Sequence, residues 1–271
     1  MVNASHQAQT AANHDSLVVR GLSFAYGSRK LWEDVDFEAP AGVVTGILGN
    51  NGTGKSTLMN CIGGILTPKS GEVMLGDINL LKLSRRERAR RISYVAQRFE
   101  TSGASVYDTV LLGRLPYFGA GPTEQDHAIV ESVLRALGIA RWADRSASTL
   151  SGGEGQKVML ARSIAQEPEV LLLDEPTASL DLGSRFETLS FVKDYAQKHN
   201  VIALMVSHDV NAALAVCSNL VLIAPDGKVQ AIESSAVTQA HLSRTYGVDV
   251  KLRIIDGRRM ALVDTQLHYP N

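Results

Sequence analysis

The residues with the clearest chemical meaning form a glycine-rich run in the first quarter of the chain. They fit the pattern G-x-x-x-x-G-K-[ST], in which backbone N–H groups turn inward around a polyphosphate. The run consists of Gly49, Asn50, Asn51, Gly52, Thr53, Gly54, Lys55, Ser56 and Thr57. Lys55 is placed to reach the β- and γ-phosphates of a nucleotide, and the Ser56 hydroxyl to ligate Mg²⁺. The run therefore predicts a binding site for ATP or GTP.

The segments on either side of this run are those that such a loop requires. Residues 43–48 have the pattern of a short buried strand, and residues 58–62 are able to begin a helix. A helix that starts at the loop presents its positive end to bound phosphate. A glycine-rich turn that binds no nucleotide is the alternative, and the strand–loop–helix order disfavours it.

An acidic pair, Asp174 and Glu175, follows the apolar residues 170–173. Carboxylates at the carboxyl end of a buried parallel strand lie where ligands bind in such sheets. The first suits Mg²⁺, directly or through water, and the second is placed to orient or deprotonate an attacking water. A solvated acidic turn that caps a helix is the alternative, and the presence of a phosphate loop disfavours it.

A second anion site is indicated by Ser151, Gly152 and Gly153, which precede the helical run 156–166. Ser151 is a plausible helix cap, and the glycines leave backbone N–H groups open at a positive helix end. Taken alone, this segment is equally well explained as an ordinary helix start. Because one nucleotide needs only one set of phosphate contacts, a second set hints at another nucleotide.

Single polar or aromatic residues near the strand ends complete the candidate site. His208 ends a central strand at the edge where Asp174 and the loop also emerge, which favours a contact with the γ-phosphate. Gln97 follows a strand at that edge and could coordinate Mg²⁺ or hold water, or be an exposed strand-end residue. Tyr26 could stack on an adenine ring, although in isolation a half-buried strand tyrosine is the more ordinary interpretation.

The elements around these residues predict a mixed α/β fold. Alternating patterns in residues 16–45 and 72–75 predict antiparallel strands with a turn at 27–28. A buried strand is expected at 92–96, a helical segment at about 99–166, and further strands at 170–174, 202–206 and 220–223. Helices at about 183–199 and 209–217 separate these strands, so a largely parallel sheet follows. A hairpin turn at 225–228 leads into 229–232, and residues 234–264 predict a helix and a short hairpin around Asp256 and Gly257.

Composition narrows the classes of protein to consider. The 271 residues carry a formal net charge of −1, which gives no electrostatic reason to expect nucleic-acid binding. Cys61 and Cys217 form no metal-ligand spacing and are expected in the core. Residues 1–15 are polar and predicted to be disordered. No apolar run is long enough to span a bilayer, so the chain is expected to be cytoplasmic and to meet a membrane only through a partner.

The basic run from Arg85 to Arg91 has two interpretations. It could face lipid headgroups or a partner, since basic residues favour anionic surfaces. A solvated helix face with salt bridges is the commoner case, and we expect it here.

Together these motifs resemble the ATP-binding subunits of ABC transporters. In chain order they are Tyr26, the loop 49–57, Gln97, the signature Leu150–Glu154, and the segments 170–176, 178–181 and 207–209. The resemblance covers about residues 16–232. It implies a P-loop NTPase (RecA-like) core with a mostly parallel sheet, an N-terminal antiparallel β-subdomain and a helical subdomain inserted at about 99–166. The ATPase domain would occupy residues 16–233, followed by a C-terminal extension at 234–271. Glu154 stands where many members of the family have glutamine.

The resemblance also implies how the site works. Two chains would form a head-to-tail dimer with ATP and Mg²⁺ at its interface, in which Ser151 and Gly153 of one contact the γ-phosphate held by Lys55 and Ser56 of the other. Glu175 would be the catalytic base, and His208 would hold γ-phosphate and water. Asp181 would couple the two sites, and Gln97 would sense Mg²⁺ and link the site to the helical subdomain.

Two further stretches resemble importers of iron-siderophore, haem or cobalamin complexes. They are residues 110–117 and the C-terminal residues 245–262. The expected partners are a transmembrane permease dimer and, indirectly, an extracytoplasmic substrate-binding protein, at the cytoplasmic face of the inner membrane. A soluble ABC ATPase that acts on DNA or ribosomes is the alternative, but the length leaves no room for the inserted modules those proteins use. A regulatory protein without turnover is disfavoured because Lys55 and Glu175 are present, and export or a different solute remains possible.

Overall fold

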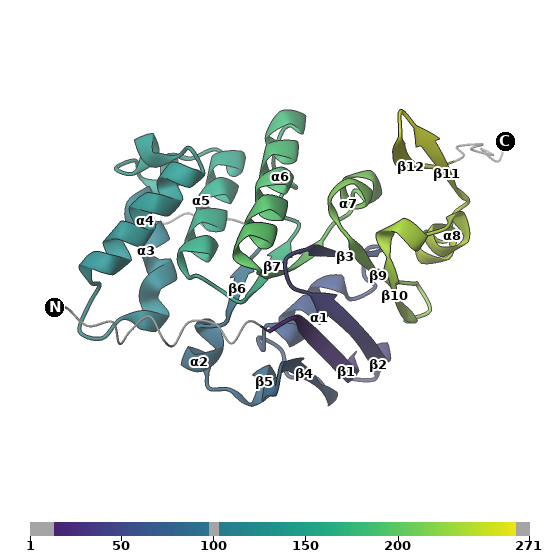
Figure 1. Ribbon diagram of the computed structural model, residues 1–271. Coiled ribbons are helices and arrows are strands. Elements are labelled where there is room, and N and C mark those ends of the chain that lie inside the picture. The colour runs from purple at the N-terminus through teal and green to yellow at the C-terminus, as the bar shows by residue number, and fades with distance from the viewer. Residues whose placement is uncertain (1–13, 98–102, 264–271) are drawn as a thin grey trace.

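The computed structural model describes residues 14–97 and 103–263, and its elements are arranged around a central sheet (Figure 1). Within these residues, six strands follow the order β10-β9-β3-β8-β7-β6, all parallel except the edge strand β10. The strands are β3 (Val44–Gly49), β6 (Ile92–Val95), β7 (Val170–Asp174), β8 (Ile202–Val206), β9 (Asn219–Ile223) and β10 (Val229–Glu233). The predicted parallel sheet and the α/β class are therefore confirmed.

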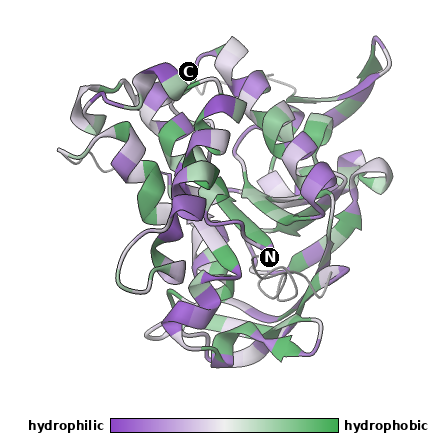
Figure 2. Cartoon of the chain, turned by 60° about the vertical axis from the view of Figure 1, so that its left-hand side comes forward, coloured by the Kyte–Doolittle hydropathy of each residue, from purple (hydrophilic) through white to green (hydrophobic). Residues whose placement is uncertain are grey.

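Both faces of this sheet are covered, which explains why its strands are apolar along their whole length. Successive residues of β7 enter different clusters: Leu171 and Leu173 pack in one, and Leu172 in the other. One cluster contains α1 (Lys55–Ile62) and the N-terminal strands, and the other contains α6 (Leu182–His199) and α7 (Val210–Val216). Figure 2 shows the central strands mostly in the green of hydrophobic residues, while the helices have mixed colours.

A second, antiparallel sheet packs over α1 on the first face. Within the described residues its order is β2-β1-β4-β5, with β1 (Ser16–Tyr26), β2 (Arg29–Pro40), β4 (Ser70–Leu75) and β5 (Ile78–Asn79). The turn between β1 and β2 falls at Gly27, whose φ of 56° suits a residue without a side chain. The predicted N-terminal antiparallel strands are thus confirmed.

A helical region lies between β6 and β7 in the chain. It contains α3 (Val106–Leu111), α4 (Glu124–Ala136) and α5 (Gly152–Ala165), with short 3₁₀ helices at Leu112–Tyr117, Ala140–Trp142 and Ala147–Thr149. The predicted start of this region at about residue 99 lies outside the described residues. Figure 1 shows the region beside the sheet, on the side of β6 and β7.

The C-terminal extension (described residues 234–263) lies at the opposite end of the molecule. It begins with a 3₁₀ turn at Ser234–Ala236 and contains α8 (Gln239–Tyr246), β11 (Val250–Ile255) and β12 (Arg258–Val263). The two strands form a hairpin that turns at Asp256 and Gly257, both with positive φ. The predicted helix and hairpin are confirmed.

The predicted disorder of residues 1–15 concerns a segment of which only His14 and Asp15 are described. The Asp15 carbonyl accepts a hydrogen bond of 2.8 Å from the Ala41 N–H, so the predicted tail extends too far at its end. No helix in the described residues is long and apolar enough to cross a membrane. Cys61 and Cys217 are both buried, as predicted.

The arginines of the basic run 85–91 mostly make other contacts than the predicted salt bridges. It forms α2 (Arg85–Ala89), after the 3₁₀ turn at Leu80–Lys82, and none of its residues is buried. Several of its arginines, however, bind main-chain carbonyls rather than a row of acidic partners. Arg88 reaches the carbonyl of Gly64, and Arg86 that of Pro116. Sequence patterns contain no signal for carbonyl partners so far away in the chain.

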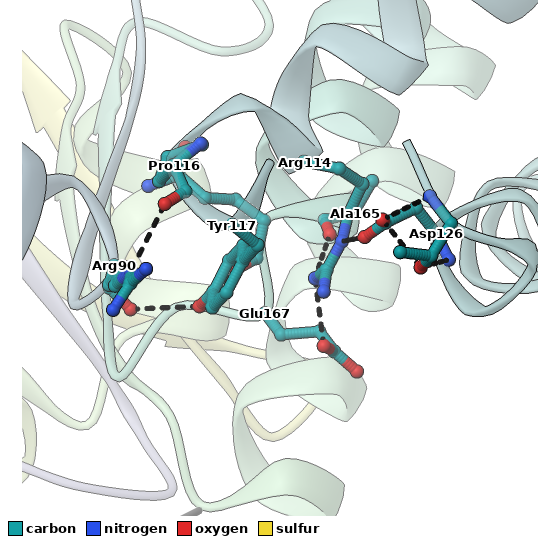
Figure 3. A network of polar contacts seen from close by, with 9 residues as sticks. Arg90, Arg114, Pro116, Tyr117, Asp126, Ala165 and Glu167 are labelled. Atoms are coloured by element: carbon teal, nitrogen blue, oxygen red, sulfur yellow. Dashed lines mark hydrogen bonds and ion pairs between the residues drawn. The ribbon is translucent and has the colours of Figure 1, made fainter. Parts of the chain in front are cut away.

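A buried polar network fastens the helical region together (Figure 3). The Arg114 guanidinium donates to Asp126 at 2.9 Å, and to the Ala165 carbonyl and the Glu167 carboxylate at 2.8 Å each. The Tyr117 ring stacks against the same guanidinium at 4.2 Å. Although burial opposes ionisation of Asp126, hydrogen bonds from Thr123 and Arg114 lower the pKa of that carboxyl. Arg114 therefore neutralises the buried charge of Asp126 and connects the start of α4 to the end of α5.

We predict that Arg114→Met lowers the free energy of unfolding by about 3 kcal/mol, because it leaves the Asp126 carboxylate buried without its partner. Urea denaturation measures the change. The matched control is Arg135→Met, since Arg135 forms an exposed ion pair with Glu131 on α4. That change should cost less than about 0.5 kcal/mol. Equal losses in the two variants would contradict a structural role for the buried pair.

Candidate nucleotide-binding and hydrolysis site

Most of the predicted site residues, apart from the signature and Asp181, gather around one cavity of about 520 Å³. This volume lies in the range of roughly 300–1,000 Å³ that is usual for small-molecule sites. The cavity is lined by Tyr26, Arg29, Leu31, Asn51, Gly52, Gly54, Lys55, Ser56, Thr57, Gln97, Glu175 and His208. These residues come from the β1–β2 hairpin, the phosphate loop and the segments that follow β6, β7 and β8.

The strand register explains why these segments converge. Strand β8 lies between β3 and β7, and its last residue, Val206, pairs with Ile47 of one and with Asp174 of the other. Beyond the strands the chain remains tied at this edge, since the Glu175 N–H donates to the Val206 carbonyl at 3.2 Å. The loops after three neighbouring strands therefore emerge side by side, as the order of parallel strands requires.

Lys55 lies beneath the phosphate loop with its amine held in place. Nζ donates to the carbonyls of Gly49 and Asn50 at 2.9 Å each, and the residue is 5% exposed. Burial lowers the pKa of this amine, and the charges of Glu175 and Asp174 partly oppose the decrease. The two carbonyls thus fix a cation at the floor of the cavity, where a phosphate oxygen would meet it.

The start of α1 is left open for an anion. Gly54 occupies its N-cap position with a φ of 93°, no side chain caps the helix, and its first turn contains no acidic residue. The free N–H groups and the positive helix end are therefore not neutralised by the protein itself. A Cβ at Gly54 would lie 2.7 Å from Nε1 of the buried Trp32, so the loop approaches β2 too closely for another residue.

Next to this helix end, oxygen ligands gather around Asp174. The Ser56 hydroxyl donates to Oδ1 at 3.1 Å, and the Tyr94 hydroxyl donates to Oδ2 at 3.0 Å. Burial, followed by the Asp174 charge, raises the pKa of Tyr94, so this phenol stays protonated and keeps its hydrogen bond. Hydroxyl and carboxylate oxygens are the ligands that Mg²⁺ prefers, so Ser56 and Asp174 fit that ion.

Glu175 lines the same cavity as the loop and is held by two side chains. Gln97 donates its amide to Oε2 at 2.7 Å, and His208 Nε2 contacts Oε1. Glu175 has a backbone φ of 52°. Residues other than glycine rarely adopt a positive φ, and those that do are often found at functional sites. A strained turn thus directs its carboxylate into the space above the phosphate loop.

Tyr26 forms part of the outer wall of the cavity. Its ring is 53% exposed and its hydroxyl lies 3.4 Å from Thr57 Oγ1. The ring packs edge-on against Phe24, with a centroid distance of 4.9 Å. At 53% exposure Tyr26 is the half-buried strand tyrosine considered from sequence, and its exposed part lines the cavity in which a base would stack.

The signature residues do not reach this cavity within one chain. Ser151 is an exposed N-cap of α5; its hydroxyl accepts from the Glu154 N–H at 3.3 Å, and its own N–H donates to Glu154 Oε2 at 2.8 Å. Gly152 and Gly153 lie instead against residues 179 and 180, where a Cβ on Gly153 would meet Leu180 at 3.0 Å. The signature and the 178–181 segment therefore form a second group.

Asp181 belongs to that second group and caps the neighbouring helix. Its carboxylate accepts from the Ser184 N–H at 2.9 Å and from the Ser184 hydroxyl at 2.8 Å. The backbone hydrogen bond, followed by the hydroxyl, lowers the pKa of Asp181. Like Ser151, this residue is exposed and lies outside the cavity lining.

Sequence reasoning missed Arg29, Leu31 and Tyr94. Arg29 pairs directly with Tyr26 across the hairpin, so the turn predicted at 27–28 already contained the signal for it. Tyr94 pairs with Leu172 on the adjacent strand, which lets its hydroxyl reach Asp174. Finding Tyr94 required the order of the strands, and no local pattern provides that.

Comparison with known proteins agrees with this fold and site. A family described as ABC transporter matches residues 32–178. An uncharacterised ABC transporter ATP-binding protein of Methanocaldococcus jannaschii is 38% identical, with 89% of this chain and 95% of the relative covered. A haemin import ATP-binding protein of Bordetella pertussis is 35% identical, with coverage of 86% and 93%. A cobalamin import ATP-binding protein of Halobacterium salinarum is 38% identical over 79% of this chain but only 54% of its own length.

Among solved structures, a metal-chelate type ABC transporter in an inward-facing conformation contains a similar chain. It superposes with a TM-score of 0.80 at 27% identity and covers 93% of this chain and 99% of its own. The chain belongs to the ABC transporter family, and its fold is that of the family's ATPase cassette.

We predict that Tyr94→Phe raises the Mg²⁺ concentration needed for half-maximal nucleotide binding by about tenfold, because outer hydrogen bonds hold metal ligands in position. A fluorescent ATP analogue titrated at a series of Mg²⁺ concentrations measures this. Tyr107→Phe is the matched control, since it removes a hydroxyl bonded to His127 in the helical region. An unchanged Mg²⁺ dependence in Tyr94→Phe would show that this hydroxyl does not position Asp174.

Proposed function

We propose that the protein is the ATP-hydrolysing subunit that powers import of a metal chelate (an iron-siderophore, haem or cobalamin complex) through a membrane permease. The observation that best supports this proposal is the position of the Glu175 carboxylate. It is held by Gln97 and His208 and lines the same cavity as Lys55. This arrangement has the parts that hydrolysis of a phosphoanhydride needs: an anion cradle, ligands for a hard cation, and a base directed at one face of the bound phosphate.

Each part of the chain has a separate task in this proposal. The loop 49–57 and the open end of α1 bind the phosphates, and Tyr26 stacks on the adenine. Ser56, Asp174 and Gln97 would hold Mg²⁺, which supplies positive charge that offsets the phosphates. Glu175 accepts the proton of the attacking water, and His208 orients that water against the γ-phosphate. Lys55 compensates charge on the phosphate oxygens from below.

A second copy of the chain completes the site. Ser151, Gly152 and Asp181 are exposed, Gly153 is partly exposed, and none of the four lines the cavity of their own chain. In a head-to-tail dimer, the signature of one chain faces the phosphates bound by the other, so two ATP molecules lie between them. The separate location of two anion-binding groups in one chain supports this arrangement.

The remaining partners are proposed from the relatives. The haemin and cobalamin import proteins are 35% and 38% identical to this chain where they align, and the similar solved chain belongs to a metal-chelate type transporter. A permease dimer would attach this subunit to the cytoplasmic face of the inner membrane. An extracytoplasmic substrate-binding protein would contribute indirectly by delivering the solute.

We predict that Glu175→Gln reduces turnover by about a hundredfold or more while ATP binding persists, because the amide cannot accept the proton of water. Phosphate release and equilibrium ATP binding measure the two effects. The control is Glu187→Gln, an exposed residue of α6 paired with Lys157, which should hydrolyse ATP normally. Retained turnover in Glu175→Gln would remove that residue as the base.

The same variant tests the dimer. With ATP bound but not hydrolysed, Glu175→Gln should elute as a dimer in gel filtration with Mg²⁺ and ATP. Adding Ser151→Arg should prevent this, because a large cation would occupy the interface. Adding Ser148→Arg, on an exposed 3₁₀ turn of the same region, should leave the dimer intact. A dimer that persists with Ser151→Arg would contradict the shared site.

Transport itself is tested by purifying the tagged protein from gently solubilised native membranes. We expect a polytopic permease to copurify, and its substrate class identifies the chelate. A control preparation with the tag alone defines the background. Recovery of soluble proteins or nucleic acid without a permease would overturn the transport assignment and leave only the ATPase chemistry.

A further inference from the structure

The phosphate loop is bonded to a segment almost 200 positions further along the chain. The Asn50 side-chain amide donates to the main-chain carbonyl of Tyr246 at 2.8 Å. The Asn50 carbonyl in turn accepts from Lys55 Nζ and from the Thr53 hydroxyl, each at 2.9 Å. One residue thus joins the C-terminal extension to the lysine that binds phosphate.

The Tyr246 carbonyl is available because it lies at the end of α8. The last carbonyls of a helix have no intrahelical donor, and this helix is stopped by Gly247 with a φ of 69°. The Gly247 N–H turns back to the Ser243 carbonyl, whereas the Tyr246 carbonyl accepts the Asn50 amide. The negative end of α8 therefore meets a donor on the phosphate loop.

The extension has a second attachment, to the helix that follows His208. The Ala261 N–H of β12 donates to Asn211 Oδ1 at 2.7 Å, and Asn211 Nδ2 donates to the Ala261 carbonyl at 3.2 Å. Asn211 lies in the first turn of α7, whose N-cap is Asp209, the residue next to His208. This pair of hydrogen bonds fixes the hairpin to the segment that positions His208.

The helix and the hairpin that carry the two attachments also contact each other. Ser243 Oγ of α8 accepts from the Val250 N–H at 2.9 Å, at the start of β11. Leu242 and Val250 are both buried in the large core cluster. Arg259 of β12 also donates to the carbonyls of Ser234 and Val237. Packed side chains and hydrogen bonds therefore hold α8 and the hairpin together, and each has its own attachment to the nucleotide site.

We propose that the C-terminal extension positions the nucleotide site, with Asn50 linking it to the phosphate loop and Asn211 linking it to the segment that carries His208. The inference deepens the proposed function and rests on nucleotide binding at this cavity. Nucleotide that orders the phosphate loop must also stabilise α8 and the hairpin. Because the coupling free energy is the same in both directions, an ordered extension also favours nucleotide binding. Asn211 and Tyr246 act as positioning residues, since neither lines the cavity.

Hydrogen exchange followed by mass spectrometry tests this in the full chain, with and without Mg²⁺ and ADP. We expect ADP to slow exchange in peptides from α8 and β12 by about fivefold, the effect of one hydrogen bond of ordinary net strength. In Asn50→Ala, at an ADP concentration that saturates the variant, the slowing should disappear in α8, which loses its donor, and persist in β12, which Asn211 still attaches.

Asn51→Ala is the matched control, because it removes the same amide from the next residue of the loop. ADP should still slow exchange of α8 and β12 there, whatever its effect on affinity. In Asn211→Ala the slowing should persist in α8 and be lost in β12, which separates the two attachments. This variant also keeps the test decisive if Asn50→Ala folds poorly.

The outcomes separate the two proposals. Equal slowing of α8 in Asn50→Ala and the unmodified protein, or no slowing in the unmodified protein despite measured ADP binding, would overturn the role of the extension and leave the proposed function standing. Failure of the unmodified protein to bind ADP would contradict the proposed function itself. Slowing of β12 that persists in Asn211→Ala would overturn the second attachment.

Discussion

The parallel pairing of β3, β8 and β7 is the constraint on which the site depends. Because β8 lies between the other two, the loop after β3, the acidic pair after β7 and His208 after β8 all emerge at one edge. Residues separated by more than a hundred positions thereby come within hydrogen-bond distance, as Ser56 and Asp174 do at 3.1 Å. The apolar strands form the sheet, and the polar residues that follow them acquire neighbours as a consequence.

Within this frame the polar groups of the site satisfy one another. Lys55 is bonded to two carbonyls, Asp174 to two hydroxyls, and Glu175 to Gln97 and His208. A buried polar group without a partner is costly, so these contacts stabilise the site before any ligand binds. They also hold the side chains near the positions that a phosphate would require, which reduces the reorganisation needed on binding. The open start of α1 is different, since no side chain caps it.

Much of the fold and of the site could be predicted from local sequence, and the failures share a physical cause. The loop 49–57, the acidic pair and the strands around them follow from patterns of a few residues. Tyr94, the carbonyl contacts of Arg86 and Arg88, and the bond from Asn50 to Tyr246 depend on segments that meet only in the folded chain. Hydrogen bonds to main-chain carbonyls are especially hard to predict, because every residue provides such an acceptor and the sequence does not mark the one that is used.

The signature segment illustrates how a site can be built and yet be incomplete in one chain. Glu154 satisfies the Ser151 N–H, and the Ser151 hydroxyl serves as acceptor for the Glu154 N–H, which leaves the hydroxyl proton with no acceptor among the described residues. The backbone N–H groups of Gly152 and Gly153 begin α5, a helix of 14 residues whose positive end favours an anion. None of these residues lines the cavity around the phosphate loop of the same chain. In a single chain the signature thus lies outside the nucleotide cavity, and this separation is the physical basis for proposing that nucleotide joins two copies.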